Sequence, residues 1–176
     1  TLKRYALLSE NSRDIILFIR YTDGQIMDAN LAAIQTYGYS KDELLQKTVF
    51  DLRSSSTVKD ARPHLNQANK DGNFRFETEH HRKDGTRFPV EVNSHRAEID
   101  GQIWLMSIVR DISERKQHEK KNMESQRFFQ AISDALAEEI CVLDHQGVIL
   151  NTNEAWKVFA ANNQANDPAK VGVGVN

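Results

Sequence analysis

Two adjacent histidines, His80 and His81, are the residues whose chemistry most directly suggests a metal site. They belong to the alternating segment FRFETEHHR, residues 74–82, which predicts a β-strand. Because successive side chains of a strand point to opposite faces, the pair does not converge on one ion. No further His, Cys or carboxylate stands at a spacing typical of a metal site. We therefore expect no metal, with His80 facing inward and His81 outward.

The remaining candidates for chemistry have simpler interpretations. His64 stands at the start of a predicted helix, and we interpret it as a solvated polar residue. The pair His118-Glu119 superficially matches a histidine-kinase phosphoacceptor box, but no Pro follows, so a solvated linker helix is favoured. Glu77 and Glu79 fall on an exposed strand face, without a pattern for acid–base catalysis. No nucleophile–base pair or phosphate loop is recognisable, and we do not expect an enzyme.

Composition limits the partners of the chain. The sequence has 176 residues, 39% hydrophobic and 27% charged, with a formal net charge of −2, which argues against a nucleic-acid binder. The single Cys141 excludes an internal disulfide framework. The single Cys fits an intracellular protein best, and we expect a cytoplasmic location. The apolar run Ile15–Ile19 is too short to span a bilayer, so we expect no direct membrane contact. The chain opens on Thr1, and we expect it to be a piece of a longer protein.

The first half of the chain predicts two strands followed by three helices. Residues 1–13 are expected to form a short amphipathic helix. Strands over 15–21 and 25–29 flank a turn at Asp23-Gly24. Helices then follow over 31–38, 41–46 and about 60–72. Their expected N-caps are Asn30, Ser40 (in a capping box with Glu43) and Asp60.

Three further strands complete the predicted sheet. Residues 74–82, 87–99 and 102–109 read as strands, and the turns between them fall at 83–86 and at Asp100-Gly101. The order is strand, strand, three helices, three strands. This predicts an α+β fold, a five-stranded antiparallel sheet with helices inserted between strands 2 and 3. Residues 113–137 follow as one long polar helix without Gly or Pro.

One phrase of the sequence occurs twice. DGQIMDAN (23–30) is echoed by QGVILNTN (146–153), and each places an Asn six positions after the turn Gly. We interpret residues 138–176 as the truncated start of a second copy. Its apolar side chains are expected to be poorly ordered or to pack on a neighbour; they are Ile140, Val142, Ile149, Trp156 and Phe159.

These phrases, in this order, closely resemble PAS-domain sensors, the modules of histidine kinases, diguanylate cyclases and related signalling proteins. The matching segments are Asp23-Gly24 with Asn30, YGYSKDELL (37–45), RKDGTRFPVEV (82–92) and VRDISERK (109–116). The chain departs from the family at Gln46, where a Gly is usual, and at Ser113, where a Thr is usual. The resemblance implies a PAS fold with a cap helix over 1–13, a sensor domain over 14–112, a linker helix over 113–137 and a second PAS domain beginning at 138.

The resemblance also implies a ligand cavity on the inner sheet face. Combined with strand parity, it gives a set of candidate lining residues: Ile34, Tyr37, Phe50, Phe74, Phe76, Thr78, His80, Val90, Val92, Leu105, Ser107 and Val109. His80 occupies the place where flavin-binding members carry a ligand-contacting Asn, although a His bonded to a neighbouring strand or water is the favoured interpretation. Residues 30–72 contain no photoreactive Cys, and His64 is poorly placed as a haem ligand. The cofactor stays unknown.

The opposite sheet face carries its own apolar row. The row consists of Trp104, Met106 and Ile108, which alternate with the inward residues. Burial of these side chains requires a cover, supplied either by Tyr5 and Leu8 of the first segment or by a partner chain. We therefore expect a homodimer.

The expected function is a non-catalytic sensory module. The module would bind a small ligand or cofactor, dimerise, or do both. The resulting change would pass through Asp111, Ile112 and Ser113 to the long helix. It would then regulate a downstream effector in the same chain, of the histidine kinase or diguanylate cyclase type. The alternative is a purely structural dimerisation domain with a filled core and no ligand.

Overall fold

The computed structural model describes residues 11–162 and 173–174. Internal contacts divide the chain into two compact units, residues 1–116 and 117–176. Most of the helix predicted over 1–13 lies outside the described residues, and so do Tyr5 and Leu8.

The described part of the first unit has its elements in the predicted order, with a short 3-10 turn added. The elements are β1 (Ile15–Arg20), β2 (Ile26–Ala29), α2 (Leu31–Tyr37), α3 (Lys41–Leu45), η1 (Val58–Asp60), α4 (Ala61–Asp71), β3 (Asn73–His81), β4 (Arg87–Ile99) and β5 (Gln102–Asp111).

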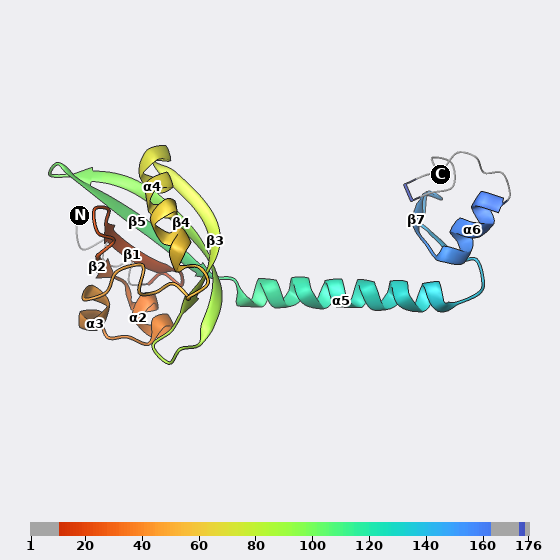
Figure 1. The fold of residues 1–176 in the computed structure, drawn as a ribbon, viewed down its shortest axis with the longest axis horizontal. Helices are drawn as coiled ribbons and strands as arrows, with labels where there is room; N and C mark the ends of the chain where they lie inside the picture. The colour runs from red at the N-terminus through yellow and green to blue at the C-terminus, as the bar shows by residue number, and fades with distance from the viewer. Residues whose placement is uncertain (1–10, 163–172, 175–176) are drawn as a thin grey trace. The chain divides into compact units, whose positions relative to one another are not determined.

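The five strands form one antiparallel sheet in the order β2-β1-β5-β4-β3 (Figure 1). The first strand thus pairs with the last strand of this unit, β1 with β5, and β2 and β3 form the two edges of the sheet. Asp100 and Gly101 join β4 to β5 with φ values of 52° and 74°, the left-handed conformations of a tight hairpin turn. Helices α2, α3 and α4 pack against β1, β2 and β3 respectively. The predicted α+β topology is confirmed.

Local capping explains where the inserted helices begin. The side chain of Asn30 accepts the backbone N–H of Ala33, and Ser40 and Glu43 form the predicted capping box of α3. Asp60 does not cap α4, so that prediction is wrong. The chain enters α4 from the 3-10 turn η1, which leaves Asp60 in helical conformation, and the carbonyl of Val58 accepts the N–H of Ala61.

The core lies between the helices and one face of the sheet. Strand alternation places Ile15, Leu17 and Ile19 of β1 in this core. The largest buried side chains there come from both layers: Tyr37 and Leu44 from helices, Leu52 from a loop, and Phe88, Val90, Leu105 and Val109 from strands.

Helix α5 (Ser113–Ala135) follows β5 and ends slightly before the predicted residue 137. The second unit also contains β6 (Cys141–Leu143), β7 (Ile149–Thr152) and α6 (Glu154–Asn162). Strands β6 and β7 form a hairpin rather than an irregular segment. Ile149 is buried and Phe159 exposed, whereas Ile140, Val142 and Trp156 are half-buried.

The repeated Asn makes closely similar bonds in both units, with one further bond, to Ser133, in the second. The Asn30 carboxamide accepts the N–H groups of Ile16 and Ala33 and donates to the carbonyl of Asp14. The Asn153 carboxamide accepts the N–H groups of Ile140 and Trp156 and donates to the carbonyls of Ser133 and Glu138. Each Asn therefore ties a hairpin to the start of the next helix.

Candidate functional site

A pocket opens between α4 and the inner face of the sheet in the first unit. Its cavity volume is about 30 Å³, room for about one or two water molecules. Most of its wall is apolar, from β1, β3, β4, β5, α4 and the loop before η1: Leu17, Ile19, Val49, Leu52, Ala61, Leu65, Phe76, Val92 and Val109. Five polar residues complete it: Arg53, His64, His80, Ser94 and Ser107.

Arg53 reaches into this pocket from the loop that follows α3. The backbone of this loop is bonded to the end of β3, with Ser54 N–H donating to the carbonyl of Glu79 at 3.1 Å and His81 N–H to that of Leu52 at 3.0 Å. These bonds fix the direction of the Arg53 side chain, which is only 7% exposed. Burial lowers its pKa to about 10, and the guanidinium stays charged near pH 7.

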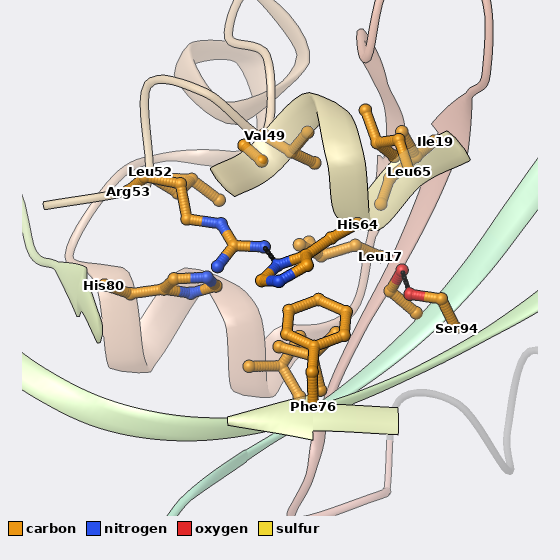
Figure 2. Close-up of a pocket in the computed structure, with 14 residues that line it drawn as sticks. Leu17, Ile19, Val49, Leu52, Arg53, His64, Leu65, Phe76, His80 and Ser94 are labelled. Carbon is orange, nitrogen blue, oxygen red and sulfur yellow. Dashed lines mark hydrogen bonds between the residues drawn. The ribbon is translucent and has the colours of Figure 1, made fainter. Parts of the chain in front are cut away.

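His64 and Phe76 flank the guanidinium. Arg53 Nη2 lies 3.5 Å from His64 Nδ1, and the guanidinium carbon lies 5.0 Å from the centre of the Phe76 ring (Figure 2). The His64 ring also packs against Phe76 in a tilted arrangement, with centroids 4.0 Å apart. The predicted solvated His64 is therefore wrong: it is half-buried, because α4 lays its first turn over the β3 aromatics. Burial, and then the charge of Arg53, lower the pKa of His64.

His80 closes another side of the pocket and is 5% exposed, as strand parity predicts. Its Nδ1 lies 2.7 Å from the hydroxyl oxygen of Tyr37 on α2. Its partner among the described residues is thus a helix side chain rather than a neighbouring strand. Burial above all, followed by the charges of Arg53 and His81, holds the pKa of His80 well below its ordinary value. The imidazole is therefore neutral at pH 7, and Arg53 supplies the positive charge of the pocket.

Ser94 and Ser107 form a polar pair on the sheet side of the pocket. They are direct cross-strand partners on β4 and β5, both buried, and their hydroxyl oxygens lie 2.7 Å apart. Two hydroxyls that bond to each other retain acceptor capacity and one spare proton. The pair therefore offers both a donor and an acceptor to an occupant.

The pocket contains five of the predicted cavity residues: Phe76, His80, Val92, Ser107 and Val109. The other seven do not line it. Tyr37, Val90 and Leu105 fill the core; Ile34, Phe50 and Phe74 are partly buried against it; Thr78 is half-buried on β3. The sequence analysis did not identify Arg53 as a pocket residue. The only signal for it in the sequence is a charged residue that follows the apolar Leu52 in a loop.

The predicted signal-transfer residues lie where β5 joins α5. Asp111 accepts the backbone N–H of Ser113 at 2.9 Å and pairs with Arg82 at 3.0 Å. The guanidinium of Arg82 lies 3.9 Å from the centre of the Phe88 ring. Ile112 is buried, and its N–H donates to the carbonyl of Pro89. Contacts thus lead from the core aromatics to the first residue of α5.

The outer sheet face carries the predicted apolar row. Trp104, Met106 and Ile108 are half-buried. Across β1, Met106 faces Phe18 and Ile108 faces Ile16. We call these five residues the outer patch: Ile16, Phe18, Trp104, Met106 and Ile108. Trp104 Nε1 is buried and has no hydrogen-bond partner among the described residues.

Two classes of site are not found in the part of the chain that the structure describes. None of its helices is both long and apolar enough to cross a bilayer. Over residues 11–162 and 173–174, no three His, Cys, Asp or Glu side chains gather as a metal ion would require.

Comparison with known proteins gives a family match and several relatives. A family model described as "PAS domain" matches residues 13–114. The methyl sulfide methyltransferase-associated sensor of Methanosarcina acetivorans is 32% identical over 117 residues, which cover 66% of this chain and 12% of that protein. Diguanylate cyclase DgcM of Escherichia coli K12 is 33% identical over 115 residues, 63% of this chain and 27% of that one.

A solved structure supports the same assignment. The PAS domain of an HTR-like protein from Haloarcula marismortui superposes with a TM-score of 0.57 at 29% identity, and the match covers 63% of this chain and 91% of that chain. The chain thus spans a minor part of the curated relatives but nearly all of this isolated domain.

Proposed function

The chain belongs to the PAS family of sensory domains, and from that premise we propose that residues 14–112 bind a small ligand in the pocket beside Arg53. The observation that carries this proposal is a mostly apolar pocket with a buried charged group aimed into it. A core built only for stability has little use for such a group, since a buried charge is costly unless it is paired. We propose no catalytic role for this domain.

The route for the signal runs through Arg82 and Asp111. An occupant that moves His80 also moves Tyr37, whose ring centre lies 5.8 Å from that of Phe88. Phe88 in turn contacts the guanidinium of Arg82, the ion-pair partner of Asp111. Because Asp111 holds the first N–H of α5, a shift there alters the start of the linker helix. The downstream effector would be a histidine kinase or a diguanylate cyclase.

Dimerisation through the outer patch is the second part of the proposal. Apolar side chains on the solvent face of an antiparallel sheet favour a cover. Residues 1–10 and a second copy of the chain would together cover the outer patch. The matching bonds of Asn30 and Asn153 support a further element, a second PAS domain that starts near residue 138.

Ligand binding is tested by native mass spectrometry and an absorption spectrum of freshly purified protein. We expect a noncovalent adduct, and the spectrum would identify a flavin or a haem. An empty protein that no small molecule stabilises would instead favour the alternative, a structural dimerisation domain.

The route is tested in the full-length protein with Asp111→Asn. We expect effector output to lose its dependence on the ligand, while Asp100→Asn in the β4–β5 turn keeps it, because Asn tolerates the positive φ of that position. Unchanged regulation in Asp111→Asn would show that the signal takes another path.

A further inference from the structure

The pocket has little room in the conformation that the structure shows. Its volume of about 30 Å³ admits one or two water molecules, so a larger occupant requires part of the wall to move. Three of the lining residues, Ala61, His64 and Leu65, belong to α4, and the others belong to strands or to the loop before η1. Helix α4 is therefore the part of the wall that could move away without breaking the sheet.

Helix α4 is held on the sheet by a small apolar surface. Of its eleven residues, only Ala61, Leu65 and Ala68 are buried, and the two alanines contribute little apolar area. The packing of the His64 ring against Phe76 is the other main contact. The helix lies over β3 and β4, away from α2 and α3 (Figure 1). Leu65, the only large aliphatic residue of α4, thus provides most of its apolar attachment.

The other side-chain contacts between α4 and the rest of the domain lie at the surface. The hydrogen bonds, of 3.0–3.3 Å, are from Arg62 to the carbonyls of Tyr21 and Thr22, from Tyr21 to Asn66, and from Arg96 to Asn69. The Arg62 guanidinium also lies over the ring of Phe50. Water replaces exposed hydrogen bonds when they break, so each of them contributes little to holding the helix in place.

The contact of α4 with the sheet also keeps Arg53 buried. The guanidinium ends between His80 and His64, with Nη2 3.5 Å from His64 Nδ1 (Figure 2). Nε and Nη1 are buried without a hydrogen-bond partner among the described residues. The wall contains no Asp or Glu, and Asp60 attracts the charge only from a distance. A buried charge without an ion pair is costly, and movement of α4 would return it to water.

The segment that contains α4 is anchored to the sheet at both ends. On one side, the carbonyl of Glu79 on β3 accepts the N–H of Ser54 at 3.1 Å and the hydroxyl of Thr57 at 2.8 Å. On the other side, the carbonyl of Gly72 accepts the N–H of Arg96 on β4 at 2.8 Å. Gly72 has a φ of 76°, which a glycine adopts without strain. Residues 58–71, which comprise η1 and α4, lie between these anchors, and we call them the lid.

We propose that the lid opens as one body, between its anchors at Thr57 and Gly72, to admit a ligand to the pocket and to expose Arg53 to water. The small apolar attachment through Leu65 and the cost of burying Arg53 bring the open and closed states close in free energy, as a gate requires. The inference deepens the proposed ligand binding and rests on it for its purpose, but its test needs no ligand.

The test is the labelling of cysteines placed at two valines of β4. Val92 lines the pocket, whereas Val90, on the same face of the same strand, is also buried but does not line it. Val92→Cys and Val90→Cys are each made in the 176-residue chain with Cys141→Ser and are treated with N-ethylmaleimide. We expect Val92→Cys to react at least tenfold faster, because Val90→Cys becomes accessible only when the domain unfolds. Urea unfolding of each variant gives the rate expected from unfolding alone.

Changes in the attachment of the lid should shift the labelling of Val92→Cys in opposite directions. Leu65→Ala should accelerate it at least tenfold, because the main apolar contact is lost. Arg53→Met should slow it at least threefold, because the closed lid then buries no charge. The matched controls are Ile99→Ala and Arg75→Met, both at exposed side chains, and they should leave the rate unchanged.

Amide exchange tests whether the lid moves as one body. The amides of α4 beyond its first turn should show one common degree of protection, lower than that of β1 and β5. Arg53→Met should raise this protection over the whole helix. Protection that instead declines gradually toward one end of α4 would show fraying of the helix and would overturn the proposed lid.

The contrary results of the labelling are equally distinct. Equal rates in Val92→Cys and Val90→Cys would overturn the lid, and so would a Val92→Cys rate that neither Leu65→Ala nor Arg53→Met changes. A lid that opens in a chain that binds no small molecule would support this inference and refute the proposed ligand binding. A ligand bound by a chain whose lid stays closed would refute this inference alone.

Discussion

The hydroxyl oxygen of Tyr37 lies 2.7 Å from Nδ1 of His80, and the two side chains, 43 positions apart in the sequence, are both buried. Burial raises the pKa of Tyr37 and lowers that of His80, so the bond joins a protonated phenol to a neutral imidazole. It links α2 to β3 directly beside the pocket. We therefore expect the pair to stabilise the packing of α2 on β3, and to be the first contact through which a change in the pocket reaches α2.

Replacing Tyr37 with Phe removes the hydroxyl and leaves Nδ1 of His80 without this partner. We expect a loss of about 1–3 kcal/mol in the free energy of unfolding, the cost of a buried polar group left unpaired. Urea unfolding followed by circular dichroism measures it. Tyr21→Phe is the matched control, since its exposed hydroxyl bonds to Asn66 and its loss should stay within about 0.5 kcal/mol. Equal losses in the two variants would contradict the assigned role of the bond.

Stability should fall with acid because of His80. Its folded pKa lies well below the unfolded value, so the unfolded chain takes up a proton first. The stabilising effect of the neutral group is complete above about pH 6.5 and declines as the pH falls below it, by up to about 1.4 kcal/mol per pH unit. Urea midpoints between pH 7.5 and 5 measure the slope.

His80→Asn should flatten this slope, whereas His118→Asn on the exposed surface of α5 should keep it. The charged or titratable groups that act on or contact His80 are Arg53, His81 and Tyr37. Both variants retain all three. An identical slope in His80→Asn would mean that other groups control acid sensitivity.

The sequence was sufficient for features that depend on near neighbours. The N-cap at Asn30, the capping box of Ser40 and Glu43, and the hairpin at Asp100-Gly101 all follow from residue types a few positions apart. Strand parity placed His80 inward for the same reason.

The pocket itself depends on contacts between distant segments. Arg53 belongs to the polar run RSSST, which has no periodicity, and its direction is set by backbone bonds to the end of β3. His64 looked solvated because its cover comes from Phe74 and Phe76, which no local pattern ties to α4. The failed cap at Asp60 has a similar origin, since η1 is a turn that the helix pattern does not reveal.

The buried pair of Ser94 and Ser107 should respond non-additively to mutation. Ser107→Ala leaves the Ser94 hydroxyl buried without its partner and should cost about 1–3 kcal/mol. Adding Ser94→Ala removes the orphaned group, so the double variant should be more stable than the sum of the two single changes, by about 0.5–3 kcal/mol. Ser94→Ala combined with Ser55→Ala, an exposed serine, should be additive. Additivity in both pairs would argue against the bond.

Glu77 should hold the first turn of α5 against the sheet. Its carboxylate pairs with Lys116 at 2.8 Å and also with Arg115. Because all three side chains are partly exposed, Glu77→Gln should cost less than about 1 kcal/mol of global stability. Amide exchange at Lys116 should nevertheless accelerate, and high salt should give the wild type the same behaviour. Glu79→Gln, whose contact with Arg87 is 3.8 Å, is the control. Equal exchange in both variants would contradict this role.

The outer patch should control self-association. Met106 lies near its middle, opposite Phe18 on β1, so Met106→Lys places a charge among apolar side chains. If a second copy covers this face, the dissociation constant of the dimer should rise at least tenfold, about 1.4 kcal/mol of association free energy. Sedimentation velocity over a range of concentrations measures this, and circular dichroism checks folding. Ile99→Lys, at the exposed end of β4, should leave association unchanged. A wild type that stays monomeric throughout would refute the homodimer, and residues 1–10 would then be the cover to test next.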